Sequence, residues 1–175
     1  MDKHRRIFKL ASILLQYPEE WVQDQELQEE VSYIEHPQVK ELFWRFIHYV
    51  NAKELEELGE NYVSTFDFNE KTSLYLTYLL FGDGQERGAA FVKLKKEFDE
   101  AGLPIEDEEL PDYLPVVLEF AALAKEEYAR KLFLIHRKAI DLLHAELESI
   151  QNPYRWIVQG CILIIDSLLT EQKAS

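Results

Sequence analysis

Residues 132–147, LFLIHRKAIDLLHAEL, carry the clearest structural signal in the chain. Their apolar side chains recur every three or four residues, which is the spacing of one face of an α-helix. The members of this stripe are Leu132, Ile135, Ala139, Leu142, Leu143 and Leu147. Comparable stripes recur from residue 7 to residue 168, and no β-hairpin pattern interrupts them. The sequence therefore predicts an all-α protein of about eight helices, with residues 1–175 forming a single compact domain.

Local signals also predict where several helices begin and end. Gly102 suits the left-handed residue that terminates a helix, and Asn152 suits the cap of the last helix. Between residues 99 and 112 the chain carries seven acidic residues, two prolines and no basic residue. This composition predicts an acidic loop around 99–112, which ends where Asp112 caps the next helix.

The net charge of −14, from 19 basic and 33 acidic residues, narrows the possible partners. An excess of acidic over basic residues opposes binding to nucleic-acid backbones and anionic membranes, and it favours a basic partner. The only cysteine, Cys161, lies on a helical apolar face, which excludes intramolecular disulfides and predicts a buried thiol. A chain without disulfides fits a reducing compartment, so we expect a cytoplasmic protein.

The N-terminal residues require a separate interpretation, because Arg5-Arg6 resembles part of a twin-arginine export signal. Lys9 interrupts the apolar run that such a signal requires, and no small-residue cleavage site follows. The apolar residues there keep helical spacing instead. We therefore expect an amphipathic helix at this end, and no apolar run in the chain is long enough to predict a membrane span.

The sequence contains no complete metal-binding pattern. Asp141 and His144 are one helical turn apart, as in di-iron bundle proteins, but those proteins need a second such motif and further carboxylates. His136 has no ligand partner at a suitable spacing, and we expect it to pack in the core. We therefore expect neither a metal site nor a bound cofactor.

The glycine-rich segment 82–88 does not predict catalysis either. A phosphate-binding loop follows a strand, whereas this segment follows a helical stripe and includes two acidic residues. We interpret it as a turn between helices, in which Arg87 pairs with Asp83. No serine or cysteine stands in a nucleophile motif, so the residues themselves give no reason to expect an enzyme.

Aromatic residues gather between residues 62 and 81, where Tyr62, Tyr75 and Tyr78 are flanked by phenylalanines such as Phe66. Tyrosine combines apolar area with a hydroxyl group, and it is favoured on surfaces that bind peptides. Together with the acidic loop, these rings predict a groove for a basic amphipathic segment. The alternative is that the rings fill the core.

Several blocks of sequence together resemble the nitrate reductase delta chain, the NarJ-type family of molybdenum cofactor assembly chaperones. The blocks are YVSTFDF at 62–68, KTSLYLTY at 71–78, Gly82-Asp83 with Arg87-Gly88, and ELPDYLP at 109–115 with Leu118-Glu119-Phe120. The Pro-Pro-Tyr-Glu-Ser type block of the chaperones for trimethylamine-N-oxide and dimethyl-sulfoxide reductases is absent. The resemblance is therefore to the nitrate reductase branch.

This resemblance implies a helical-bundle chaperone that is not itself an enzyme and is not part of the finished nitrate reductase. Such a protein binds the apo form of the nitrate reductase alpha subunit in the cytoplasm, including its leader-like N-terminal segment. It holds that subunit competent for insertion of the molybdenum cofactor and an iron–sulfur cluster before docking at the membrane. We expect a monomer or weak dimer that neither inserts into the membrane nor binds nucleic acid.

The candidate peptide-binding residues fall in or near these blocks, and two kinds of side chain are involved. Aromatic candidates for an apolar wall are Tyr62, Phe66, Tyr75, Tyr78 and Tyr113, and acidic candidates for binding cations are Asp67, Asp83, Glu109, Asp112 and Glu119. Pro111 and Pro115 would shape the loop. The alternative for the same side chains is packing and helix capping alone, with Asp112 as a cap and Asp83 paired with Arg87. Two other functions stay open: a helical chaperone or interaction protein for another molybdenum oxidoreductase, and a carboxylate-bundle metalloprotein.

Overall fold

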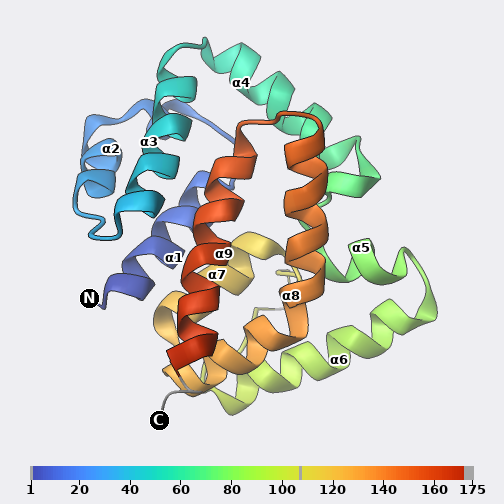
Figure 1. The fold of residues 1–175 in the computed structure, drawn as a ribbon. Helices are drawn as coiled ribbons and strands as arrows, with labels where there is room; N and C mark the ends of the chain where they lie inside the picture. The colour runs from blue at the N-terminus through green and yellow to red at the C-terminus, as the bar shows by residue number, and fades with distance from the viewer. Residues whose placement is uncertain (1, 107, 172–175) are drawn as a thin grey trace.

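The computed structural model describes residues 2–106 and 108–171, and these form a bundle of α-helices (Figure 1). The nine α-helices of the described residues are α1 (Lys3–Leu14), α2 (Gln25–Ser32), α3 (Pro37–Asn51), α4 (Leu55–Tyr62), α5 (Leu76–Phe81), α6 (Gln85–Glu100), α7 (Leu114–Leu123), α8 (Glu126–Ser149) and α9 (Tyr154–Glu171). Three short helical turns, η1 (Glu20–Gln23), η2 (Val63–Asp67) and η3 (Glu70–Thr72), lie between them. The predicted all-α fold is confirmed, with one helix more than the expected number. That the whole chain forms one domain stays a prediction.

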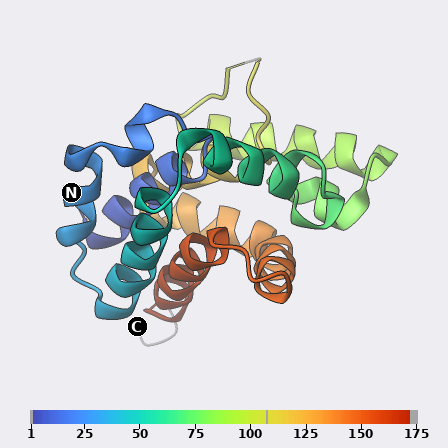
Figure 2. The same cartoon turned by 90° about the horizontal axis from the view of Figure 1, so that it is seen from above.

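The core lies where α1, α7, α8 and α9 meet. The α1 helix packs along α7, and α9 lies between α3 and α8 (Figures 1 and 2). Phe8 of α1 and Phe133 of α8 contact each other there, with ring centroids 4.9 Å apart. Gly160 lets α9 approach α3, because a Cβ atom at this position would lie 2.7 Å from the Phe43 ring. The close packing of α9 on α3 therefore depends on glycine at position 160.

The stripe predicted on α8 is only partly buried. Leu132, Leu143 and Leu147 lie in the core, as the helical spacing predicts. Ile135 and Leu142 do not, since they are 46% and 43% exposed. One face of α8 therefore keeps apolar side chains at the surface.

The predicted C-terminal end of α6 and the predicted start of α9 are confirmed. Gly102 has a φ of 73°, and the Leu103 N–H donates to the Phe98 carbonyl at 3.0 Å, which is the pattern of a glycine-terminated helix. Asn152 Oδ1 accepts a hydrogen bond of 3.0 Å from the backbone N–H at the start of α9. Because α6 continues to Glu100, the acidic loop begins two residues later than predicted. Between α6 and α7, the described residues 101–106 and 108–113 extend away from the bundle (Figure 2).

The α1 helix is the amphipathic helix expected near the N-terminus, with Ile7, Leu10 and Leu14 buried. Within residues 2–106 and 108–171, none of the helices combines the length and the apolar character that crossing a membrane requires.

Candidate functional site

A short pairing of two loop segments organises the site. Tyr75 and Tyr113 form an isolated antiparallel β-bridge, in which the Leu114 N–H donates to the Leu74 carbonyl at 2.8 Å. The two tyrosine rings stack, with centroids 5.1 Å apart and an interplanar angle of 28°. Because these tyrosines immediately precede α5 and α7, the bridge places the starts of both helices side by side.

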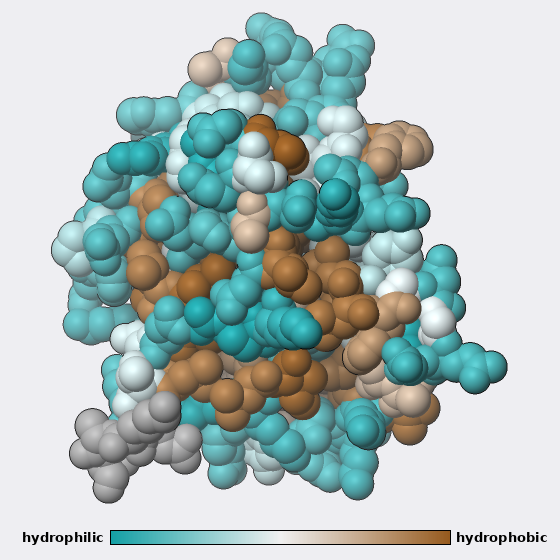
Figure 3. Space-filling model, turned by 45° about the vertical axis from the view of Figure 1, so that its right-hand side comes forward, coloured by the Kyte–Doolittle hydropathy of each residue, from teal (hydrophilic) through white to brown (hydrophobic). Residues whose placement is uncertain are grey.

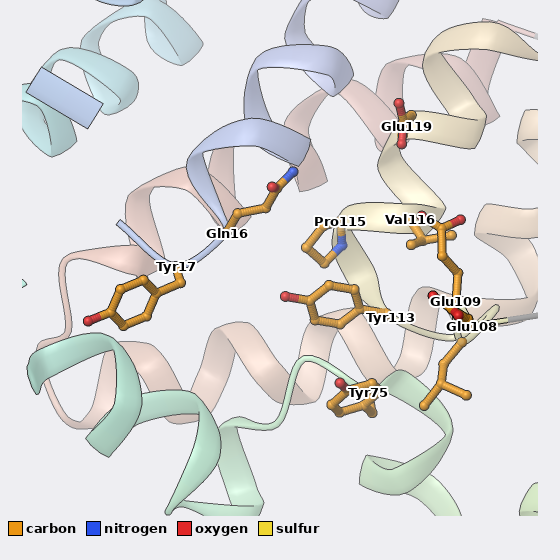
Figure 4. A pocket seen from close by; sticks show the side chains of 10 residues that line it. Gln16, Tyr17, Tyr75, Glu108, Glu109, Tyr113, Pro115, Val116 and Glu119 are labelled. Carbon is orange, nitrogen blue, oxygen red and sulfur yellow. The ribbon is translucent and has the colours of Figure 1, made fainter. Parts of the chain in front are cut away.

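The larger of two pockets at this bridge, which we call the Tyr113 pocket, has a volume of about 500 Å³. Figure 4 shows Tyr75 and Tyr113 beside each other in it, with Glu108 and Glu109 to one side and Tyr17 to the other. Three lining residues are glutamates and none is a cation. Its lining consists of Gln16, Tyr17, Tyr75, Glu108, Glu109, Leu110, Tyr113, Pro115, Val116 and Glu119.

The second pocket, which we call the Tyr78 pocket, has a volume of about 330 Å³ and shares Tyr75 with the first. It is lined by Phe66, Asp67, Asn69, Glu70, Ser73, Tyr75, Tyr78, Asp83 and Arg87. The carboxylate of Glu70 raises the pKa of the Tyr78 phenol, so this hydroxyl stays protonated. Between them the two pockets carry six carboxylates and one arginine.

Asp112 lies buried behind the bridge and does not face either pocket. Its side chain is fully buried and accepts two hydrogen bonds from Thr77, from the backbone N–H at 3.1 Å and from the hydroxyl at 2.6 Å. Arg87 completes this cluster, because its Nε donates to the Thr77 hydroxyl at 3.1 Å and its guanidinium lies 3.6 Å from the Asp112 carboxylate. The cluster therefore fixes α5, α6 and the end of the acidic loop together.

Two predictions about Asp112 are therefore wrong. Asp112 was predicted to cap α7, the helix that follows it in the chain, but the N-cap of α7 is Tyr113. The Asp112 side chain instead caps the N-terminus of α5, which is distant from it in the chain. Its burial also prevents the predicted contact with cations of a client. The predicted pairing of Arg87 with Asp83 is present at 3.6 Å, on the exposed side of the same guanidinium.

Tyr62 and Phe66 lie in an aromatic core. Tyr62 lines neither pocket, which corrects its prediction as part of an accessible apolar wall, whereas Phe66 is buried and still contributes to the lining of the Tyr78 pocket. They are 5% and 6% exposed, and both pack edge-on against Tyr154. The Tyr62 hydroxyl donates to the Leu15 carbonyl at 2.9 Å and lies 3.3 Å from the Tyr113 hydroxyl. Burial raises the pKa of Tyr62, which keeps the phenol neutral and able to donate. Tyr62 thus supports the Tyr113 pocket from beneath.

The other candidates reach the surface of the two pockets. Tyr75, Asp67, Asp83 and Glu109 are exposed, while Tyr78, Tyr113 and Glu119 are partly exposed. Pro111 and Pro115 are both buried at the end of the loop, and Pro115 lines the Tyr113 pocket.

Sequence reasoning missed several residues of the lining. Gln16 and Tyr17, which follow α1, lie outside every recognised block, and nothing in the local sequence marks them. Glu108 belongs to the acidic run and Glu70 adjoins a block, so these two could have been included. Glu119 also forms a 3.0 Å ion pair with Lys9 of α1.

The chemistry of these pockets is that of binding. Carboxylates and phenols attract and orient cations, and the aromatic rings offer apolar contact. Cys161 is buried, and burial raises the pKa of its thiol to about 12, which makes it a packing side chain. Across residues 2–106 and 108–171, no group of three or more His, Cys, Asp or Glu side chains is placed to hold a metal ion.

Comparison with known proteins agrees with the sequence blocks. A family model described as the nitrate reductase delta subunit matches residues 34–156. The probable nitrate reductase molybdenum cofactor assembly chaperone NarJ of Bacillus subtilis is 34% identical, over 92% of this chain and 89% of its own length. The nitrate reductase-like protein NarX of Mycobacterium tuberculosis is 32% identical over 85% of this chain, which corresponds to 22% of NarX. The probable nitrate reductase molybdenum cofactor assembly chaperone NarW of Escherichia coli is 26% identical, over 97% of this chain and 72% of its own.

Two of these relatives are named as assembly chaperones and not as enzymes, in agreement with the absence of a nucleophile motif from the sequence. The matched residues include the Tyr75–Tyr113 bridge and most of the lining of both pockets. The chain therefore belongs to the nitrate reductase delta subunit family.

Proposed function

We propose that this protein is a cytoplasmic assembly chaperone for the catalytic (alpha) subunit of a respiratory nitrate reductase. It binds the apo subunit, with the leader-like N-terminal segment of that subunit in the Tyr113 and Tyr78 pockets. It holds the subunit competent for insertion of the molybdenum cofactor and an iron–sulfur cluster, and it is released before the enzyme is complete. The names of the relatives support the assembly role.

The observation that supports this proposal is that eight of the ten candidate residues line two pockets that share Tyr75. Six carboxylates around these pockets attract a segment rich in arginine and lysine. Long-range attraction of this kind raises the association rate and is screened by salt. A basic segment is therefore favoured over a neutral or acidic one.

Apolar contact is available next to the acidic surface. Glu109, Val116 and Glu119 also line a third pocket of about 260 Å³, whose other side chains include Phe98 and Phe120. An amphipathic helix can place its basic residues at the glutamates and its apolar face against this pocket. Because ordering such a segment costs free energy, the complex stays weak enough to dissociate after maturation.

The direct test is calorimetric titration with a synthetic peptide of the N-terminal segment of the nitrate reductase alpha subunit, at low and moderate salt. The double variant Glu108→Gln with Glu109→Gln removes two exposed pocket carboxylates. Its matched control, Glu26→Gln with Glu30→Gln on α2, makes the same change in net charge outside the pockets. We expect the pocket variant to bind about three- to tenfold more weakly, since exposed charge pairs contribute up to about 1 kcal/mol.

Two results would contradict the proposal in different ways. Equal weakening in the two double variants would show that net charge, and not these pockets, attracts the peptide. If no peptide binds at either salt concentration, a pull-down with the whole apo subunit decides whether another part of it is recognised. Copurification of a different molybdenum oxidoreductase from anaerobic cells would identify another client.

A further inference from the structure

Phe68 is a large apolar side chain that faces solvent almost completely. It lies between η2 and η3, and at 82% it has the highest exposed fraction among the exposed large apolar side chains of the described residues. Others, such as Leu134 and Ile135, lie on a regular helix, and Figure 3 shows apolar side chains gathered on the face where α5, α6 and α8 lie. Phe68 instead belongs to a short connection, so its exposure is not that of a residue on the outer face of a helical stripe.

The backbone that presents Phe68 is a turn of π-helix. The Phe68 N–H donates to the Val63 carbonyl, five residues earlier, at 3.1 Å, which is the hydrogen bond of such a turn. Phe66, two residues before Phe68, is only 6% exposed and packs in the aromatic core. The turn therefore directs one phenylalanine of this block inward and the other outward. Single turns of π-helix are frequent at functional sites.

Buried hydrogen bonds hold this turn in place. The Asn152 side-chain amide donates to the Thr65 hydroxyl at 2.8 Å, and that hydroxyl donates to the Asn61 carbonyl at 2.6 Å. The Thr72 hydroxyl donates to the Thr65 carbonyl. Because Asn152 also caps α9, these bonds tie the turn to the start of that helix. The backbone next to Phe68 is therefore already ordered, and a partner that covers the ring loses little free energy in ordering it.

Phe68 lies at the edge of the Tyr78 pocket. Its sequence neighbours on both sides, Asp67 and Asn69, belong to the lining of that pocket, although Phe68 itself does not. The lining contains three carboxylates, those of Asp67, Glu70 and Asp83. A segment bound in this pocket therefore passes close to the exposed ring and to acidic side chains at the same time.

The positive charge in this region does not cancel the acidic side chains. The guanidinium of Arg87, the one cation of the lining, lies 3.6 Å from the carboxylates of Asp83 and Asp112. Lys71 adjoins Glu70 in sequence and lies outside the lining. Even with both cations counted, they are two against the three carboxylates of the lining. The surface beside Phe68 therefore favours a partner that carries cations next to its apolar side chains.

We propose that Phe68 is the apolar anchor for the client, on which the apolar face of a basic amphipathic segment packs while its cations contact Asp67 and Glu70. This inference rests on the proposed function and specifies which part of the surface selects an amphipathic segment over one that is only basic. An isolated exposed apolar residue is ordinary on a protein surface, and what distinguishes Phe68 is the hydrogen-bonded turn beneath it and the acidic pocket beside it. Aromatic side chains are enriched in interfaces, because each removes a large apolar area from water.

The test is calorimetric titration of Phe68→Ala with the N-terminal peptide of the nitrate reductase alpha subunit, at low and moderate salt. We expect about tenfold weaker binding at both salt concentrations, because salt does not screen an apolar contact. The loss caused by Glu108→Gln with Glu109→Gln should instead shrink as salt increases. Phe68→Leu keeps most of the apolar area and should recover most of the affinity. The matched control, Leu134→Ala, removes an exposed apolar side chain that lines neither pocket and should bind as the unmodified protein does.

Two further measurements separate direct contact from an effect on folding. Because Phe68 is exposed, Phe68→Ala should keep the thermal denaturation midpoint of the unmodified protein. The photo-reactive residue p-benzoylphenylalanine, placed at position 68, should crosslink to the peptide on irradiation, whereas at position 134 it should not.

The outcomes distinguish this inference from the proposed function. If the peptide binds and the double glutamate variant weakens it, but Phe68→Ala does not, the anchor is overturned and the acidic pockets remain the binding site. A loss in Phe68→Ala that disappears at moderate salt, or that occurs without crosslinking from position 68, would also overturn the anchor. Absence of binding to the unmodified protein would overturn both the anchor and the proposed contact with the leader-like segment.

Discussion

Replacing His136 with phenylalanine should change how the stability of this protein depends on pH. The folded protein lowers the pKa of this imidazole to about 4, whereas in the unfolded chain it is about 6.5. Between these two values the unfolded state binds a proton that the folded state does not bind. The free energy of unfolding therefore falls as the pH decreases through this window, by about 3 kcal/mol in total.

The part of this loss that lies between pH 7 and pH 5 is about 2 kcal/mol. The phenylalanine variant has a side chain of similar size and no titrating group, so this contribution is missing from it. Glu86 and Lys93, which line a cavity together with His136, are present in both proteins, and their contributions cancel in the comparison. The unmodified protein should thus lose about 2 kcal/mol more than the variant over this range.

The measurement is urea unfolding, followed by tryptophan fluorescence, of both proteins at pH 7, 6 and 5. A control variant, His48→Phe, changes an exposed histidine of α3 and should follow the unmodified protein. Parallel stability curves for the unmodified protein and His136→Phe would refute the reasoning. They would mean that the folded protein accepts a proton on His136 as easily as the unfolded chain does.

Two other substitutions test the packing and the buried cluster. Gly160→Ala places a methyl group against the Phe43 ring and should lower the free energy of unfolding by about 1–3 kcal/mol. Gly88→Ala in α6 meets open space and should raise the free energy of unfolding by up to about 1 kcal/mol. A urea titration that ranks the two variants in the opposite order would contradict the packing of α3 on α9. Asp112→Asn removes a buried charge at the start of α5 and should lower the free energy of unfolding by about 2 kcal/mol. The control, Asp83→Asn at an exposed position, should change this free energy by no more than about 0.5 kcal/mol. Equal thermal denaturation of the two variants would show that the fold does not need the Asp112 charge.

Local chemistry explains why much of the fold could be predicted from the sequence. The glycine at 102 ends α6 because it adopts a positive φ without strain, and Asn152 starts α9 because its side chain accepts from a nearby N–H. Both signals act within a few residues. The burial of His136 and Cys161 also follows from helical spacing, since each lies on the inner face of its helix.

The site was predicted less completely, because burial depends on distant partners. The blocks include Tyr75, Tyr113 and Glu109, which line one pocket, and their role in binding a peptide stays a prediction. They could not separate these from Tyr62, whose hydroxyl is held by the carbonyl of Leu15, 47 residues away in sequence. A tyrosine in a helical stripe gives the same local sequence signal whether it lines a pocket or lies in the core.

The sequence by itself determined the all-α class, the end of α6, the start of α9, the acidic charge and the family, because each of these depends on residue type and short-range spacing. The tertiary structure alone decided which helix Asp112 caps and which aromatic rings reach the surface. It also decided that Ala89, Ala90 and Ile135 enclose a cavity around His136. These features arise where segments distant in the chain meet, and the packing of side chains across such contacts is not encoded by any local pattern.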